Sequence, residues 1–245
     1  MKSKVWFITG ASKGFGFEIA RAVLASGDQV VATVRKNAGE LAARLNGGDR
    51  ALVVTLDVTN EKEVKAGVRA AIDKFQRIDV LVNNAGYGLL AATEEASAEE
   101  VRKQYDTNVF GLLNVTRAVL PQLRRQGSGH IINISSLFGY LNSVPGFGLY
   151  GSTKFAVEGI SEGLVDASQN ISTGHEDLSY NVSHCSGQLE NYARLALSKA
   201  VLHALGCVAT KIGLVDIVSG VRNVTLVIDL EQSIFQVEPG VIQGN

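Results

Sequence analysis

The chain is 245 residues long, of which 46% are hydrophobic and 19% charged, a composition that suits one α/β domain of ordinary size. Its 23 basic and 24 acidic residues are mixed along the sequence and give a formal net charge of −1, which argues against nucleic acid or an anionic membrane as a partner. We find neither an apolar run of the ~18 residues that a membrane span needs nor a signal peptide, so a cytoplasmic protein with both cysteines reduced is predicted.

Nearly continuous apolar runs alternate with helical patterns along the chain, as expected for strands that are covered by helices on both faces. The predicted strands are Val5–Thr9, Val30–Val34, Ala51–Leu56, Val80–Asn83 and His130–Ile134. Apolar residues at helical spacing run from Val64 to Phe75 and again from Val101 to Leu123. This order predicts a Rossmann-type doubly wound parallel sheet, a single domain over residues 1–245, with its ligand site at the carboxyl ends of the strands.

The first strand leads into three spaced glycines and then into a helix. Glycine lets a backbone turn tightly and approach phosphate groups, and the N–H groups at a helix start favour negative charge. The segment therefore predicts a binding site for the pyrophosphate of a dinucleotide, although a tight strand-to-helix turn alone would also explain it. The candidate cofactor-binding residues here are Gly10, Ser12, Lys13, Gly14, Phe15 and Gly16.

The second strand ends in Arg35 and Lys36, where an NAD-binding chain of this fold carries a carboxylate for the ribose 2′-hydroxyl. The planar guanidinium of Arg35 can pair with a 2′-phosphate, and Lys13 adds a second positive charge nearby. NADP(H) is therefore the predicted cofactor. The alternative is that both cations only solvate a loop.

Residues 99–123 carry more apolar side chains than one helix face needs, because Phe110, Leu113 and Val115 fall outside the main stripe. A subunit interface would explain them. Burial within a single chain would explain them equally well.

Polar residues gather where later strands are predicted to end. They are Asn83-Asn84-Ala85-Gly86, Asn108, Ser135-Ser136, Tyr150 and Lys154. Tyr150 and Lys154 lie one helical turn apart and thus on one face, where an ammonium beside a phenol is expected to lower the phenol's pKa toward neutrality. The pair is a candidate acid–base unit, although such a pair is usually a solvated helix face.

Taken together, these motifs resemble the short-chain dehydrogenase/reductase family over residues 1 to about 165. The motifs are TGxxxGxG at Thr9–Gly16, NNAG at Asn83–Gly86, the asparagine of Thr107-Asn108-Val109, the serine of Asn133-Ile134-Ser135-Ser136 and YxxxK at Tyr150–Lys154. The resemblance implies an NAD(P)-dependent oxidoreductase. It also implies a dimer or tetramer built on residues 99–123 and on the helix that starts at Tyr150.

The resemblance further implies roles for individual residues. Tyr150 would donate a proton to a substrate carbonyl, and Ser136, which lies 14 residues before it, would hydrogen-bond the same oxygen while Ser135 is structural. Lys154 would hold the nicotinamide ribose and tune Tyr150, and Asn108 would order a water that relays protons to Lys154. The remaining cofactor contacts implied are Asp57, Val58, Asn84, Ala85 and Gly86.

The family pattern fails after about Val165, where the usual Pro-Gly following a sixth strand is missing. One interpretation makes Val182–Cys185 that strand, with Ser186-Gly187 in place of Pro-Gly. The other treats 169–222 as an insertion and makes Asn223–Leu230 the sixth strand. Neither interpretation assigns the substrate lid to particular residues, and the region expected to contain it is 185–222.

The functional prediction is an NADP-dependent reductase that converts a small ketone or aldehyde reversibly to an alcohol. The alternative is a non-catalytic NADP-binding sensor with a degenerate substrate pocket. No metal site is predicted, because the histidines and cysteines of the tail lack further ligands at zinc-type spacing.

Overall fold

The computed structural model describes residues 3–140, 142, 144–169 and 179–183. The predicted lid at 185–222 and the dipeptide Ser186-Gly187 lie outside these residues.

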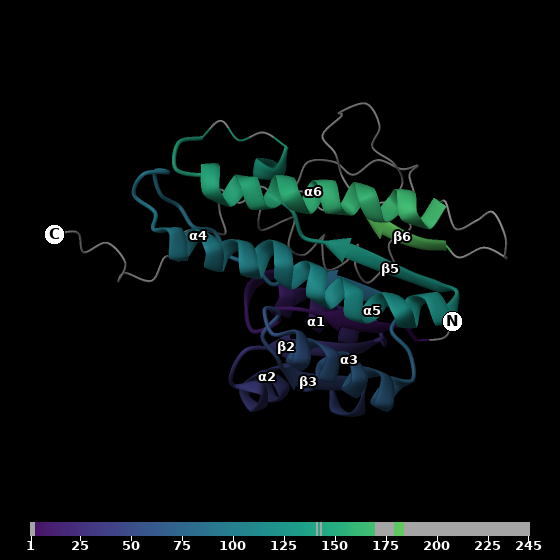
Figure 1. Cartoon of the computed structure of the whole chain (residues 1–245). Coiled ribbons are helices and arrows are strands. Elements are labelled where there is room, and N and C mark those ends of the chain that lie inside the picture. Colours follow the sequence, from purple (N-terminus) through teal and green to yellow (C-terminus); the bar gives the residue numbers. More distant parts are fainter. Residues whose placement is uncertain (1–2, 141, 143, 170–178, 184–245) are drawn as a thin grey trace.

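Six parallel strands form one sheet in the order β3-β2-β1-β4-β5-β6, with helices packed against it (Figure 1). The strands are β1 (Val5–Ile8), β2 (Gln29–Val34), β3 (Ala51–Thr55), β4 (Val80–Asn83), β5 (Ser128–Asn133) and β6 (Ser179–Ser183). The five strands predicted from apolar runs are all present, with ends that differ by two residues at most. The predicted doubly wound sheet is therefore confirmed, and its order reverses between β1 and β4, where this fold binds ligands.

The sixth strand is the next described element after α6 (Gly148–Gln169). β6 pairs in parallel with β5, with Val182 opposite Ile131. The strand begins three residues earlier than the predicted Val182–Cys185, but it occupies the place that this interpretation assigned to it. The competing interpretation made Asn223–Leu230 the sixth strand; these residues lie outside the described part of the chain, and the place beside β5 is taken by Ser179–Ser183.

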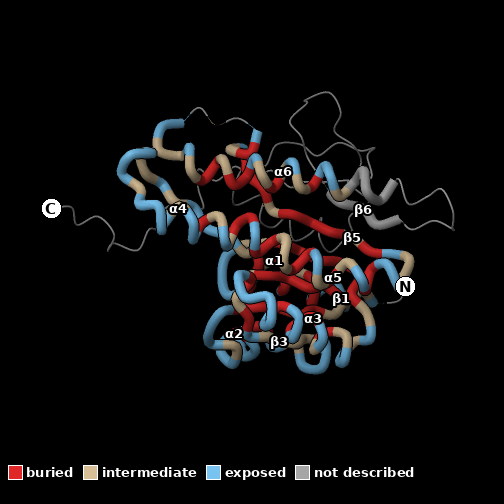
Figure 2. The backbone as a smooth tube through the Cα atoms, in the orientation of Figure 1, coloured by how far each residue is buried: buried red, intermediate tan, exposed pale blue. Residues whose placement is uncertain are grey.

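Side chains alternate between the two faces of the sheet and so build two separate cores. Trp6 and Ile8 pack with α1 (Gly14–Ala25) and α2 (Ala38–Leu45). Val5 and Phe7 pack with α3 (Glu61–Phe75) and α5 (Leu112–Gln126), and Leu164 of α6 (Gly148–Gln169) joins this second core. Figure 2 shows the buried strands between more exposed helices. Both faces are thus covered, as the continuous apolar runs predict.

The helix predicted over 99–123 is continuous but not uniform. It consists of α4 (Ala98–Tyr105), a π-helical segment η2 (Asp106–Gly111) and α5, and it starts with a capping box between Ser97 and Glu100. A π-helical turn inside an α-helix is rare and frequently marks a functional position. Here it contains Asn108.

The apolar residues outside the main stripe of this helix separate into two groups. Val115 is completely buried in the core, so burial within the chain explains it. Leu113 is half-buried, whereas Phe110 is 53% exposed. A subunit interface therefore stays a prediction for Phe110 and Leu113 only.

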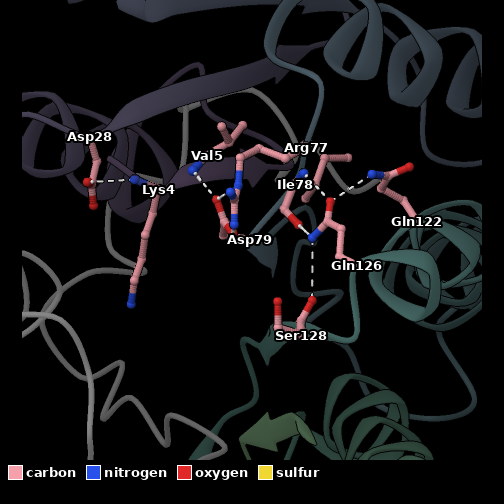
Figure 3. Close-up of polar contacts among 9 residues, drawn as sticks. All are labelled: Lys4, Val5, Asp28, Arg77, Ile78, Asp79, Gln122, Gln126 and Ser128. Carbon is pink, nitrogen blue, oxygen red and sulfur yellow. Dashed lines mark hydrogen bonds and ion pairs between the residues drawn. The ribbon is translucent and has the colours of Figure 1, made fainter. Parts of the chain in front are cut away.

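Polar side chains fasten the amino-terminal edge of the sheet (Figure 3). The Asp79 carboxylate accepts a hydrogen bond from the backbone N–H of Val5 at 2.8 Å and pairs with Arg77. Gln126 of α5 accepts from the N–H of Ile78 at 3.0 Å and donates to its carbonyl at 2.7 Å. These contacts join the starts of β1 and β4 to the end of α5, which fixes the strand register that the opposite edge depends on.

A cavity of about 460 Å³ lies at this same amino-terminal edge. Its lining residues are Ser3, Gln29, Phe75, Gln76, Arg77, Gln126 and Ser128. Arg77 and Gln126 are already engaged in the contacts just described, so we assign it no ligand. Among the helices of the described residues, none has the length and apolar character needed to cross a membrane.

Candidate active site

The segments that follow β1 to β5 emerge together at the carboxyl edge of the sheet, because the strands are parallel. They carry the glycine turn, Arg35, Asp57, Asn84 to Gly86 and Ser136. Tyr150 and Lys154 come to the same edge from the first turns of α6. The structure therefore brings together residues that are up to 144 positions apart, from Gly10 to Lys154.

Two of the glycines are required by close packing at the turn. Gly10 has φ +66°, and a Cβ there would lie 2.9 Å from the Cα of Ala85. A Cβ on Gly16 would lie 2.6 Å from the carbonyl oxygen of Gly10 and 2.5 Å from the side-chain nitrogen of Asn84. The turn is therefore pressed against the segment after β4, and it leaves the N-terminus of α1 directed at the carboxyl edge.

Asn84 and Thr9 hold these two segments together. The Asn84 side chain donates to the carbonyls of Thr9 and Gly10 at 2.9 and 3.1 Å. The Thr9 hydroxyl accepts from the backbone N–H groups of Asn84 and Ala85 at 2.9 and 3.0 Å. The predicted cofactor residues Asn84 and Ala85 thus support the shape of the glycine turn.

Positive side chains surround the turn. Lys13 and Arg35 are exposed, as a group that meets a phosphate must be. Arg44 of α2 donates to the carbonyl of Ser12 at 2.8 Å, and its guanidinium lies 4.1 Å from the ring centre of Phe17. Sequence reasoning missed Arg44, because no local pattern links residues 32 positions apart.

Asp57 and Val58 occupy the segment after β3. The Asp57 carboxylate accepts from the backbone N–H and hydroxyl of Thr59 at 2.9 and 2.8 Å. Val58 is buried and packs closely on Gly111. A Cβ on Gly111 would lie only 2.5 Å from Cγ2 of Val58. The segment that is expected to contact adenine is therefore fixed to the π-helical turn.

Asn108 is 2% exposed and uses its whole side-chain amide. Its oxygen accepts from the N–H of Tyr87 at 3.0 Å, and its nitrogen donates to the Tyr87 carbonyl at 2.8 Å and to the Thr153 hydroxyl at 3.1 Å. Thr153 lies between Tyr150 and Lys154 in the sequence, so Asn108 positions the start of α6 against the segment after β4. Its water-ordering role stays a prediction.

Ser136, Tyr150 and Lys154 are all buried, with exposed fractions of 0%, 5% and 7%. The Lys154 ammonium donates to the carbonyl of Ile134 at 2.8 Å and lies 5.7 Å from the centre of the Tyr150 ring. The Ser136 hydroxyl accepts from the N–H of Phe138 at 3.3 Å. Ser135 is buried as well, and among the described residues its hydroxyl has no hydrogen-bond partner.

The electrostatics of Tyr150 differ from the expectation. Burial raises the pKa of its phenol above the ordinary value, and hydrogen bonding with Ser136 lowers it in part. Lys154 does not bring this pKa toward neutrality in the protein alone, because desolvation of the phenolate dominates. Tyr150 is therefore a protonated phenol at neutral pH.

Lys154 itself is strongly affected by its surroundings. Burial lowers its pKa to about 8, and the charge of Glu158 opposes this shift by raising the pKa. Glu158 lies one helical turn beyond Lys154 on α6, and sequence reasoning did not single it out. An i, i+4 spacing from Lys154 was the signal that could have found it.

Comparison with known proteins places these features in a family context. A family model for the short chain dehydrogenases matches residues 4–171. An oxidoreductase, BOA17, of Botryotinia fuckeliana is 45% identical over 161 residues, which cover 65% of this chain and 58% of that protein. A 3-ketodihydrosphingosine reductase of Bacteroides thetaiotaomicron is 40% identical over 205 residues, covering 79% of this chain and 73% of that protein.

Solved structures agree with this assignment. A short-chain dehydrogenase from Streptomyces avermitilis superposes with a TM-score of 0.67 at 40% identity, covering 75% of this chain and 64% of that one. ElxO with NADP bound (TM-score 0.66, 32% identity) covers 74% and 72%. A family member from Burkholderia phymatum in complex with NAD (TM-score 0.68, 29% identity) covers 74% and 64%. The chain thus spans under two thirds of the Botryotinia and Streptomyces proteins.

Proposed function

The chain belongs to the short-chain dehydrogenase/reductase family, and we propose that it is an NADP-dependent reductase of ketones or aldehydes. The observation that carries the proposal is the convergence of Asn108, Ser136, Tyr150 and Lys154 at the carboxyl edge, beside the glycine turn. These four residues come from three separate segments. Packing alone does not require a buried phenol beside a buried ammonium, so their convergence indicates a catalytic site.

The proposed chemistry assigns the hydride to the cofactor, which supplies it to the carbonyl carbon when bound. Tyr150 donates its proton to the carbonyl oxygen as negative charge develops there, and the raised pKa of its phenol keeps that proton in place at neutral pH. Ser136 hydrogen-bonds the same oxygen. Lys154 has three N–H donors and gives one to Ile134, which leaves two for the nicotinamide ribose.

The residues at the glycine turn fit a dinucleotide phosphate. Gly10 and Gly16 leave the backbone bare where a Cβ would fill the turn, and α1 begins immediately beyond it. Solved relatives carry NADP in one case and NAD in another, so they leave the choice open. We choose NADP on the exposed Arg35 and Lys13 and on the lack of a carboxylate at the end of β2.

The proposed function is tested by replacing Tyr150 with phenylalanine. NADPH consumption with a panel of uncharged ketones and aldehydes is expected to fall by at least about 10³-fold, because the proton donor is lost. NADPH binding, followed by fluorescence, is expected to persist within about threefold. Undiminished turnover in the variant would exclude the assigned role. Tight NADPH binding without turnover by the unaltered protein would instead favour a non-catalytic sensor.

We also propose a homodimer or homotetramer, since Phe110 on the long helix stays exposed after the fold has buried Val115. The cytoplasmic location and the single domain over 1–245 remain predictions from the sequence.

A further inference from the structure

Two segments flank Tyr150, and neither contains a charged residue. They are residues 85–93, which follow β4, and residues 134–153, which join β5 to α6. They are joined by a hydrogen bond from the N–H of Ala91 to the carbonyl of Gly146 at 3.1 Å. Since 19% of the whole chain is charged, 29 residues without a single charge are unusual. These two segments therefore add no charge beside the proton donor, whose charged neighbour is the Lys154 ammonium on α6, 5.7 Å from the centre of the Tyr150 ring.

The same two segments expose large apolar side chains. Seven large hydrophobic residues are exposed in the described part of the chain, and five of them lie here with exposed fractions of 39% to 52%. These five, which we call the apolar surface, are Tyr87, Leu90, Leu137, Tyr140 and Val144. Water-exposed apolar side chains concentrated beside a catalytic group indicate a binding surface for an apolar ligand.

Gly88 brings the apolar surface next to the Tyr150 ring. A Cβ on Gly88 would lie 3.7 Å from Cδ2 of Tyr150 and 3.8 Å from Cδ2 of Leu90, so both side chains border this residue. On the other side, Phe138 meets the Tyr150 ring edge-on at 6.3 Å and stacks on Phe147 at 4.3 Å. Aromatic packing thus fixes the ring whose hydroxyl donates the proton, with Leu90 close to it.

Building on the proposed function, we infer that the substrate is an uncharged ketone or aldehyde whose apolar substituent lies on this surface, with Leu90 as a specificity-determining residue. An apolar chain gains free energy when it covers such side chains. A carboxylate placed at Leu90 would lose hydration and meet no cation from either segment. Near Tyr87 the cations Lys103 and Arg35 act together with the anions Asp106 and Glu100. In the reduction, the carbonyl carbon gains a hydride as NADPH is oxidised to NADP⁺, and the oxygen gains the Tyr150 proton.

The test compares matched substrates on the full chain with saturating NADPH. The kcat/KM values of 2-butanone, 2-hexanone and 2-octanone are expected to rise by about fourfold per buried methylene. For 7-oxooctanoate, which has the chain length of 2-octanone and a terminal carboxylate, kcat/KM is expected to be at least about tenfold lower than for 2-octanone. Leu90→Ala is expected to reduce the 2-octanone to 2-butanone ratio by about threefold to tenfold, through KM.

Phe110→Ala is the matched control, because it removes an exposed apolar side chain outside the two segments. It is expected to leave the ratio unchanged, and NADPH affinity reports whether each variant is folded. A kcat/KM for 7-oxooctanoate equal to or above that for 2-octanone would overturn the inference and leave the reductase function intact. The same holds if Leu90→Ala and Phe110→Ala have identical 2-octanone to 2-butanone ratios. If no carbonyl compound is reduced at all, the proposed function itself fails.

Discussion

Lys154 allows a quantitative prediction, because a buried ammonium makes folding depend on pH. Its pKa is lowered to about 8 in the folded protein by burial, whereas an unfolded lysine titrates near 10.4. Between these values the unfolded state binds more protons, so the free energy of unfolding rises with pH. The stabilisation is fully present above the unfolded pKa and is lost as the pH falls through about 8.

The size of the effect follows from the two pKa values. Between pH 7 and pH 9 the protein is expected to gain about 1.4 kcal/mol of stability from this residue alone. Replacing Lys154 with methionine removes the titration. At pH 7 the variant no longer has to bury an ammonium, which stabilises it by about 3 kcal/mol. It also leaves the Ile134 carbonyl without its hydrogen-bond donor, which destabilises it by about 1–3 kcal/mol. Since these nearly cancel, the pH dependence is the informative quantity.

The assay is urea unfolding at pH 7 and pH 9, followed by far-UV circular dichroism on cofactor-free protein at one fixed concentration. The wild type is expected to gain about 1.4 kcal/mol more than Lys154→Met between the two pH values. Lys62→Met, at an exposed position of α3, serves as the matched control and is expected to follow the wild type. If the free energy of unfolding changes between pH 7 and pH 9 by the same amount in Lys154→Met and the wild type, within about 0.3 kcal/mol, burial does not lower the pKa of the Lys154 ammonium.

Two further predictions concern the cofactor and the assembly. The unaltered protein is expected to bind NADPH at least about tenfold more tightly than NADH, and Arg35→Asp is expected to reverse this preference. The substitution removes the partner of the 2′-phosphate and supplies a carboxylate for a 2′-hydroxyl. Comparable dissociation constants for both cofactors in the unaltered protein would contradict the assignment. Phe110→Asp is expected to convert a dimer or tetramer into a monomer in light scattering at micromolar concentration, because the exposed ring would face a symmetry mate. A monomeric wild type would remove the interface.

Much of the cofactor half of the site could be predicted from the sequence. The glycine spacing, the apolar runs and the missing carboxylate after β2 are local patterns, and their geometry follows from one turn or one strand at a time. The five predicted strands accordingly agree with the sheet to within two residues. The i, i+4 spacing of Tyr150 and Lys154 likewise fixes their common helix face without knowledge of the rest of the molecule.

Other features depend on contacts between distant segments and were decided only by the tertiary structure. Val115 and Phe110 look alike in the sequence, but the sheet buries the first and leaves the second exposed. Arg44 reaches Ser12, and Asn108 joins Tyr87 to Thr153 from a π-helical turn that no pattern announces.

The pKa of Tyr150 shows the same division most clearly. The sequence determined that a phenol and an ammonium lie on one helix face, from which a lowered pKa was expected. The structure determined how much water each group loses, and this desolvation raises the pKa of Tyr150 and lowers that of Lys154. Spacing along a helix sets which groups are neighbours, but only the packing of other segments over them sets their dielectric surroundings, and these decide the charge that each group carries.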